Sequence, residues 1–84
     1  MWESIRVRVY AGAKGNENPR EIFIGDHSIL VKVLSEWLEE DIHFRRRKRY
    51  FKVIGVGTDE EYLIYYDITN REWFRKTQIH LPDS

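Results

Sequence analysis

Several features that would restrict the class of a small protein are missing from this chain. It has no cysteine, which excludes disulfide bonds and thiolate metal sites and is compatible with a reducing compartment. No apolar run approaches the ~20 residues that a membrane-spanning helix needs, so we expect no membrane partner. The first residues also lack the basic and apolar regions of a secretory signal, so a cytoplasmic location is expected.

Net charge is missing as well, because 14 basic residues balance 14 acidic ones. A general polyanion binder is usually basic overall, so this balance argues against that class. The charge is nevertheless distributed unevenly along the chain. An acidic block is followed directly by a basic run and then by Lys52; the block is Glu36, Glu39, Glu40 and Asp41, and the run is Arg45, Arg46, Arg47, Lys48 and Arg49.

Aromatic residues, in contrast, are abundant, with three Trp, five Tyr and four Phe among 84 residues. A chain of this length has room for one core only, and large rings give that core much buried area per residue. We therefore predict a single domain over residues 1–84 that folds without disulfide or metal staples.

The first third of the chain alternates apolar and polar residues in two stretches, which predicts two strands. One is expected over residues 5–10, and the other over residues 20–25 with Ile22 and Ile24 on the same face. Between them, residues 11–19 contain Gly, Asn and Pro, which are typical of a surface loop.

Residues 29–40 fit two different periodicities. Ile29, Val31 and Val33 fit a strand face, whereas Leu34, Trp37 and Leu38 also fit the spacing of a helix. The β-branched residues at the start favour a strand. We predict a strand to about Leu34, and the sequence leaves both strand and helix open for the remainder.

Residues 45–76 predict a meander of three strands, at 49–56, 62–68 and 72–78, with polar turns at 58–61 and 69–71. The first of these is apolar on both faces, which is typical of a central strand or of a curled sheet. The last places Trp73 and Phe74 on opposite faces. Together these patterns predict an all-β or β-dominated α+β fold, built as a small curled antiparallel sheet or an SH3-like open barrel of about five or six strands.

Aromatic and Val-rich landmarks follow one another in a fixed order from Pro19 to Phe74. They are Pro19, Phe23, the Val-rich segment 31–37 that ends in Trp37, the basic-aromatic stretch 49–53, the Tyr-rich stretch 61–67 and Trp73-Phe74. This order resembles a group of small bacterial domains of unknown function, in which a Pro-x-x-x-Phe start, a Val-rich segment ending in Trp and two Tyr-rich closing strands recur. The resemblance implies a β-dominated module and carries over no catalytic residue.

No constellation of catalytic or metal-binding residues is visible in the sequence. His27, His43 and His80 lie far apart and lack the spacing of metal ligands. The adjacent pairs Glu39-Glu40 and Glu60-Glu61 are expected to be solvated, whereas a general acid needs burial to shift its pKa. We therefore expect a protein that is not an enzyme and has no cofactor.

The basic run is the main indication of function. Consecutive cations repel one another, so they need anionic neighbours or an anionic ligand. On a strand, Arg45, Arg47 and Arg49 are expected to project together, with Arg46 and Lys48 on the other side. The predicted binding residues are the five cations of the run together with Tyr50, Trp73 and Phe74.

Two kinds of ligand are compatible with these residues. A protein-interaction module, docking a partner on an aromatic patch or an edge strand, is the favoured interpretation. The alternative is single-stranded nucleic acid or another polyanion, with phosphates on the arginines and bases stacked on the rings. Pairing between the basic run and the acidic block would weaken that alternative, and self-association through edge strands is left open.

Overall fold

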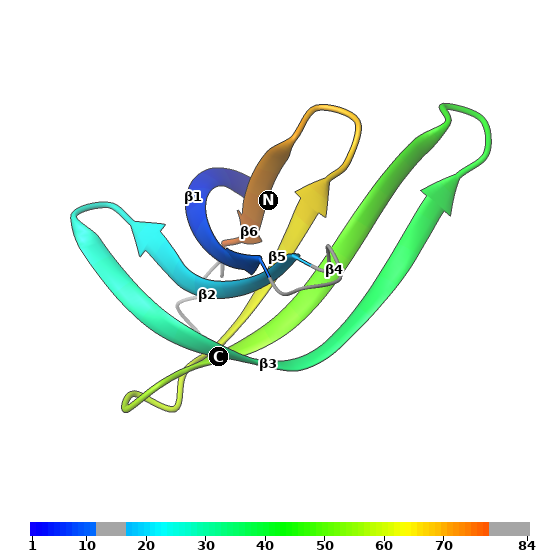
Figure 1. The fold of residues 1–84 in the computed structure, drawn as a ribbon. Coiled ribbons are helices and arrows are strands. Elements are labelled where there is room, and N and C mark those ends of the chain that lie inside the picture. Colours follow the sequence, from blue (N-terminus) through cyan, green and yellow to red (C-terminus); the bar gives the residue numbers. More distant parts are fainter. Residues whose placement is uncertain (12–16, 78–84) are drawn as a thin grey trace, which may run out of the picture.

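The computed structural model describes residues 1–11 and 17–77, and these residues form six strands and no helix. The strands are β1 (Trp2–Ala11), β2 (Glu17–Ile24), β3 (His27–Asp41), β4 (Arg46–Gly55), β5 (Glu61–Asp67) and β6 (Glu72–Lys76). Each strand pairs antiparallel with the next, and β1 also pairs with β6, so the sheet closes into a barrel (Figure 1). The predicted all-β fold and the meander of β4, β5 and β6 are confirmed, although the barrel is closed rather than open.

Closure depends on two strands that change partners along their length. The first part of β1 (2–5) pairs with β6, and its second part (6–11) pairs with β2. In the same way, residues 27–30 of β3 pair with β2, and residues 31–41 pair with β4. The barrel is therefore made of two sheets that share β1 and β3, and the larger one contains the whole meander.

The barrel interior is filled by alternate residues of its strands. The buried core cluster consists of Ile22, Val31, Phe51, Val53, Ile64 and Trp73. Phe51 and Val53 share one face of β4, and Ile22 faces inward from β2, as the period of two predicts. Burying these side chains away from water is the main source of stability for a sheet protein of this size.

The predicted helix option for residues 34–40 is wrong, because β3 continues as a strand to Asp41. Each residue from Ser35 to Asp41 pairs with a residue of β4, after an irregularity between Val33 and Ser35 that takes up one extra residue. Cross-strand pairing therefore overrides the local helical pattern. The end of this hairpin, which we call the arm (residues 38–49), extends away from the rest of the barrel (Figure 1).

Two aspartates stabilise the turn between β3 and β4 and the turn between β5 and β6. The Asp41 carboxylate accepts backbone N–H groups from His43 and Phe44. The buried Asp67 carboxylate accepts those of Thr69 and Asn70, which confirms the turn predicted there. Such side-chain bonds to the next residues are the usual reason for Asp in turns.

Some predicted strand boundaries differ from the observed ones. Val56 lies beyond the end of β4 and is exposed, rather than extending that strand. Gly57 adopts a φ of 89° in the turn that follows, where a residue without a side chain is favoured. Residues 11 and 17–19 of the predicted loop belong to strands, because β1 reaches Ala11 and β2 begins at Glu17; residues 12–16 and 78–84 lie outside the described part of the chain.

Candidate functional site

The larger sheet carries aromatic side chains on its outer face as well as in the core. Because successive side chains alternate, the neighbours of core residues Phe51, Ile64 and Trp73 point to the outside. The backbone register then brings rings from neighbouring strands opposite one another. We call these rings the outer aromatic surface: Trp2, Trp37, Tyr50, Tyr65 and Phe74.

The rings of the outer aromatic surface contact one another across five strands. Trp37 of β3 stacks on Tyr50 of β4, with ring centroids 5.4 Å apart and planes 4° apart. Tyr50 lies 5.2 Å from Tyr65, and Tyr65 lies 5.0 Å from Phe74. Trp2 of β1 meets Tyr65 edge-on at 4.8 Å. These separations are those of favourable aromatic pairs, so the rings form one continuous surface.

The central ring of this surface is buried, whereas the two Trp rings that pack on the tyrosines are partly accessible; Trp2 lies 6.0 Å from Tyr50 as well as against Tyr65. Tyr65 is only 7% exposed, but Trp2 is 36% exposed and Trp37 is 42% exposed. Burial raises the pKa of Tyr65 and of Tyr50 above 10.0, and the negative charge of Glu39 adds to the rise for Tyr50. Both phenols are therefore neutral hydrogen-bonding groups at physiological pH.

The acidic block and the basic run face each other across the arm. Glu39 lies opposite Lys48, Glu40 opposite Arg47, and Asp41 opposite Arg46. The Arg47 Nε atom is 3.3 Å from Glu40 Oε1, which makes a direct ion pair. Opposite charges at directly facing positions attract, so the acidic block partly neutralises the basic run within the fold.

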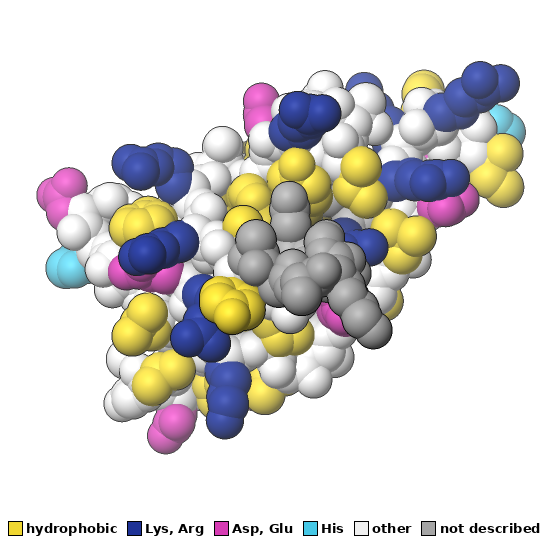
Figure 2. Space-filling model, in the orientation of Figure 1, with side chains coloured by type: hydrophobic (Ala, Val, Ile, Leu, Met, Phe, Trp, Pro, Cys, Tyr) yellow, Lys and Arg dark blue, Asp and Glu magenta, His cyan; other side chains and the backbone are white. Residues whose placement is uncertain are grey.

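Figure 2 shows how the charged and hydrophobic side chains are distributed over one face of the molecule. Lys and Arg side chains stand apart from one another in several places, with hydrophobic side chains between them (Figure 2). On the outer face of the meander, Lys52 is likewise paired with Glu61 at 3.1 Å. The cations on the outer side of β4 thus have carboxylates opposite or beside them.

The structure divides the predicted binding residues between two faces. Lys48, Tyr50 and Phe74 lie together on the outer side, and Lys48 Nζ is 4.9 Å from the centre of the Tyr65 ring. Arg46 shares that side of β4, whereas Arg47 and Arg49 alternate onto the other. Arg45 lies in the turn before β4 with a φ of 52°, so the alternation of a strand, from which its projection together with Arg47 and Arg49 was predicted, does not extend to it.

Trp73 belongs to the core and not to the accessible surface. Its ring lies 5.6 Å from Phe51 and 4.9 Å from Tyr66, and it is 9% exposed. Trp73 and Phe74 are on opposite faces as predicted, but only Phe74 reaches the outer aromatic surface. Trp2, Trp37 and Tyr65 were not among the predicted binding residues, because only the strand register shows that they adjoin Tyr50.

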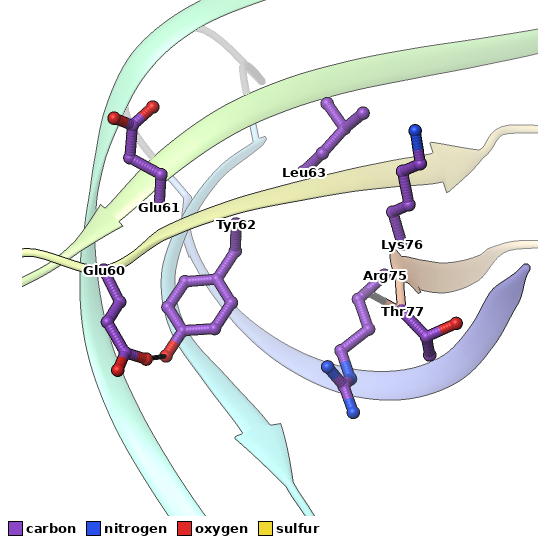
Figure 3. A pocket seen from close by; sticks show the side chains of 7 residues that line it. All are labelled: Glu60, Glu61, Tyr62, Leu63, Arg75, Lys76 and Thr77. Carbon is purple, nitrogen blue, oxygen red and sulfur yellow. Dashed lines mark hydrogen bonds between the residues drawn. The ribbon is translucent and has the colours of Figure 1, made fainter. Parts of the chain in front are cut away.

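A hollow of ≈ 530 Å³ at the other end of the barrel is a weaker candidate. It is lined by Glu60, Glu61, Tyr62, Leu63, Arg75, Lys76 and Thr77 (Figure 3). Tyr62 and Arg75 point to one side of the sheet in that view, while Leu63 and Lys76 point to the other. Tyr62 donates to Glu60 at 2.8 Å, so its hydroxyl already has a partner. These side chains do not converge on a common point.

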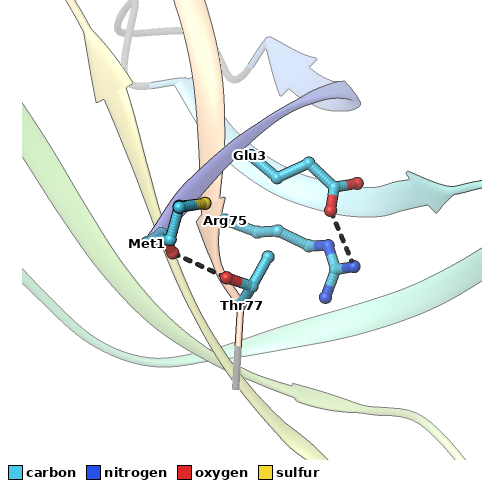
Figure 4. A network of polar contacts seen from close by, with 4 residues as sticks. All are labelled: Met1, Glu3, Arg75 and Thr77. Carbon is cyan, nitrogen blue, oxygen red and sulfur yellow. Dashed lines mark hydrogen bonds and ion pairs between the residues drawn. The ribbon is translucent and has the colours of Figure 1, made fainter. Parts of the chain in front are cut away.

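The polar groups nearby have a structural role in closing the barrel. Arg75 of β6 pairs with Glu3 of β1 at 3.1 Å, and the Thr77 hydroxyl donates to the Met1 carbonyl at 2.9 Å (Figure 4). These contacts join the first strand to the last, next to the backbone pairing of the same strands.

Neither metal chemistry nor a known relative points to another site. Within residues 1–11 and 17–77, no group of three His, Cys, Asp or Glu side chains is placed to hold a metal ion. The same residues contain no helix long and apolar enough to cross a membrane. Comparison with protein-family models, curated proteins and solved structures gives no match, so function has to be inferred from the geometry.

Proposed function

We propose that this protein is a non-enzymatic interaction module that binds an extended segment of a partner protein on its outer aromatic surface. The observation that supports this most is the continuous cluster of rings in which Trp37 and Trp2 pack on the central tyrosines while both Trp side chains stay partly exposed. Trp and Tyr are the residues that most often dominate binding energy at protein interfaces.

The charge distribution favours a protein ligand over a polyanion. Arg46, Arg47 and Lys48 each face a carboxylate of β3, so phosphates would compete with Glu39, Glu40 and Asp41. A weakly charged peptide meets no such competition. The accessible Trp rings then supply the contact area, and the neutral phenol of Tyr50, which is only partly buried, supplies a hydrogen-bonding group beside them.

A proline-containing extended segment suits this surface best. The pyrrolidine rings of its proline residues pack flat against Trp and Tyr side chains. Such a segment loses little conformational freedom on binding, because it is already extended in solution. In the stacked pair of Trp37 and Tyr50 the ring planes are 4° apart, and the Trp37 side chain is 42% exposed. We therefore expect this pair to be the main contact for the proline rings.

Selection from a library of random displayed peptides tests the proposal, because it lets the surface choose its own ligand. We expect the wild-type protein to enrich peptides that contain proline and aromatic residues. Trp37→Ala should weaken the binding of these peptides at least about tenfold, since truncating a ring in the contact costs ~1–2 kcal/mol or more. Tyr10→Ala is the matched control, because Tyr10 is an exposed ring on β1 outside the outer aromatic surface. Enrichment that survives Trp37→Ala, or no enrichment, would contradict the proposal.

A titration with a random single-stranded oligonucleotide tests the alternative ligand. If about six cations met phosphates, affinity would fall by on the order of 10³ between about 50 and about 200 mM salt. We expect no saturable binding even at the lower salt concentration. A steep salt dependence that disappears in Lys48→Glu would replace the peptide ligand by a polyanion.

A further inference from the structure

The arm and the part of β3 leading into it have an edge with which no strand among residues 1–11 and 17–77 pairs. β2 accompanies β3 only as far as the pair Glu21 and Leu30, after which the two strands diverge (Figure 1). Residues 31–41 of β3 pair with β4 on one side, and no strand of the described chain pairs with them on the other. Such an edge presents a row of backbone donors and acceptors that another strand can use.

The arm's part of this edge is exposed, and its charged side chains are all acidic. Residues 34–41 are all exposed, and they include Glu36, Glu39, Glu40 and Asp41 but no Lys or Arg. Acidic side chains repel a second acidic strand, so pairing between two copies of β3 is disfavoured. A strand carrying positive charges meets attraction at the same positions.

β4 shows which strand chemistry is complementary to β3. On the paired edge, the cations Arg46, Arg47 and Lys48 stand opposite three of the four carboxylates. The remaining one, Glu36, faces the ring of Phe51 and has no cation opposite. A second basic strand on the free edge would lie next to the same row of carboxylates and would give Glu36 a cationic neighbour.

We propose that the edge of β3 over residues 34–41, with which no described strand pairs, binds a basic extended segment of a partner protein by strand addition. Main-chain hydrogen bonds fix the added strand, and its Lys or Arg side chains pair with the carboxylates of β3 on both faces. This interface goes beyond the outer aromatic surface, because it uses the backbone edge of β3 rather than the outer face of the sheet and selects a basic ligand, although Trp37 belongs to both.

A fluorescent, end-blocked peptide with the sequence of residues 46–53 is the probe, because it copies the strand that already fits β3. We expect saturable binding at low salt in an anisotropy titration, together with slower amide hydrogen exchange at residues 35–41. The same peptide with N-methyl groups on alternate residues keeps every charge but loses backbone donors, and it should not bind.

Charge variants of the protein test whether the carboxylates of β3 attract the basic segment. Glu36→Lys should weaken the peptide about three- to tenfold, since it replaces an attractive cross-strand position by a repulsive one without removing an ion pair to β4. Glu72→Lys makes the same charge change at an exposed position on β6 and should leave binding unchanged.

Three results would overturn the proposal. They are absence of binding at low salt, equal binding of the N-methylated peptide, and binding that leaves exchange at residues 35–41 unaltered. Sedimentation velocity provides a separate check on the occupant. A dimer that protects the same amides without any peptide would assign this edge to a second copy of the chain.

Discussion

Exchanging the charges of Glu40 and Arg47 tests the register of the arm, on which the neutralisation of the basic run depends. The two side chains are directly opposite, and Arg47 Nε lies 3.3 Å from Glu40 Oε1. The Glu40 side chain is 50% exposed and the Arg47 side chain is 64% exposed, so solvent screens their attraction. Reversing one charge replaces attraction by repulsion and should cost about 0.5–1.5 kcal/mol of unfolding free energy.

The double variant is the decisive measurement. Glu40→Arg and Arg47→Glu should each be destabilising, whereas the combination restores the attraction with its polarity inverted. We expect its unfolding free energy to lie within about 0.5 kcal/mol of the wild type, and both single losses to shrink at about 1 M salt. Urea unfolding followed by circular dichroism gives the global values, and amide exchange in the arm gives the local ones.

A different register would produce a different result. A slip of one residue would put the two side chains on opposite faces of the sheet, where they cannot interact. The losses of the single variants would then add in the double variant. Additivity of this kind would refute the facing arrangement of the acidic block and the basic run, and with it the preference for a weakly charged ligand.

Two further predictions concern the core and the tyrosines. Phe51→Ala should cost ~3–5 kcal/mol of unfolding free energy, because the Phe51 ring is fully buried. Phe44→Ala, at an exposed ring in the arm's turn, should change the unfolding free energy by less than ~0.5 kcal/mol. Equal losses in urea unfolding would contradict the assigned core. Burial raises the pKa values of Tyr50, Tyr62 and Tyr65 above 10.0, so the folded state holds these protons more tightly than the unfolded state. The associated stability is present below pH ~10 and is lost as the pH rises through the pKa values of the folded state. The midpoint temperature of thermal unfolding should therefore fall between about pH 9 and about pH 11. An unchanged midpoint would contradict this prediction.

The strands were predictable from the sequence wherever one side chain in two is apolar. Ile22 and Ile24 indicated one face of β2, and Phe51 and Val53 indicated one face of β4. The segment beyond Leu34 was not decided, because Leu34, Trp37 and Leu38 also satisfy a helical period. Its conformation depends on pairing with β4, which is a long-range contact that local propensity does not contain.

The candidate site was predictable only in part, for a related reason. Alternation placed Trp73 and Phe74 on opposite faces but did not say which face is the inside of the barrel. That depends on closure through β1 and β6, which brings Ile5 opposite Trp73 and Ser4 opposite Phe74. The contribution of Trp2 follows from the same closure, and it could not be inferred from residues 45–76 alone.

The two aromatic layers follow from the geometry of a small barrel. The meander is apolar on both faces, but a barrel has only one interior, and Phe51, Ile64 and Trp73 occupy it. The alternate residues Tyr50, Tyr65 and Phe74 must therefore be covered from outside. Trp2 packs on Tyr65 and Trp37 packs on Tyr50, yet the two Trp side chains remain 36% and 42% exposed themselves. The exposed aromatic area has thus been moved to the two covering Trp side chains rather than removed, and a partner would gain most by covering those two rings.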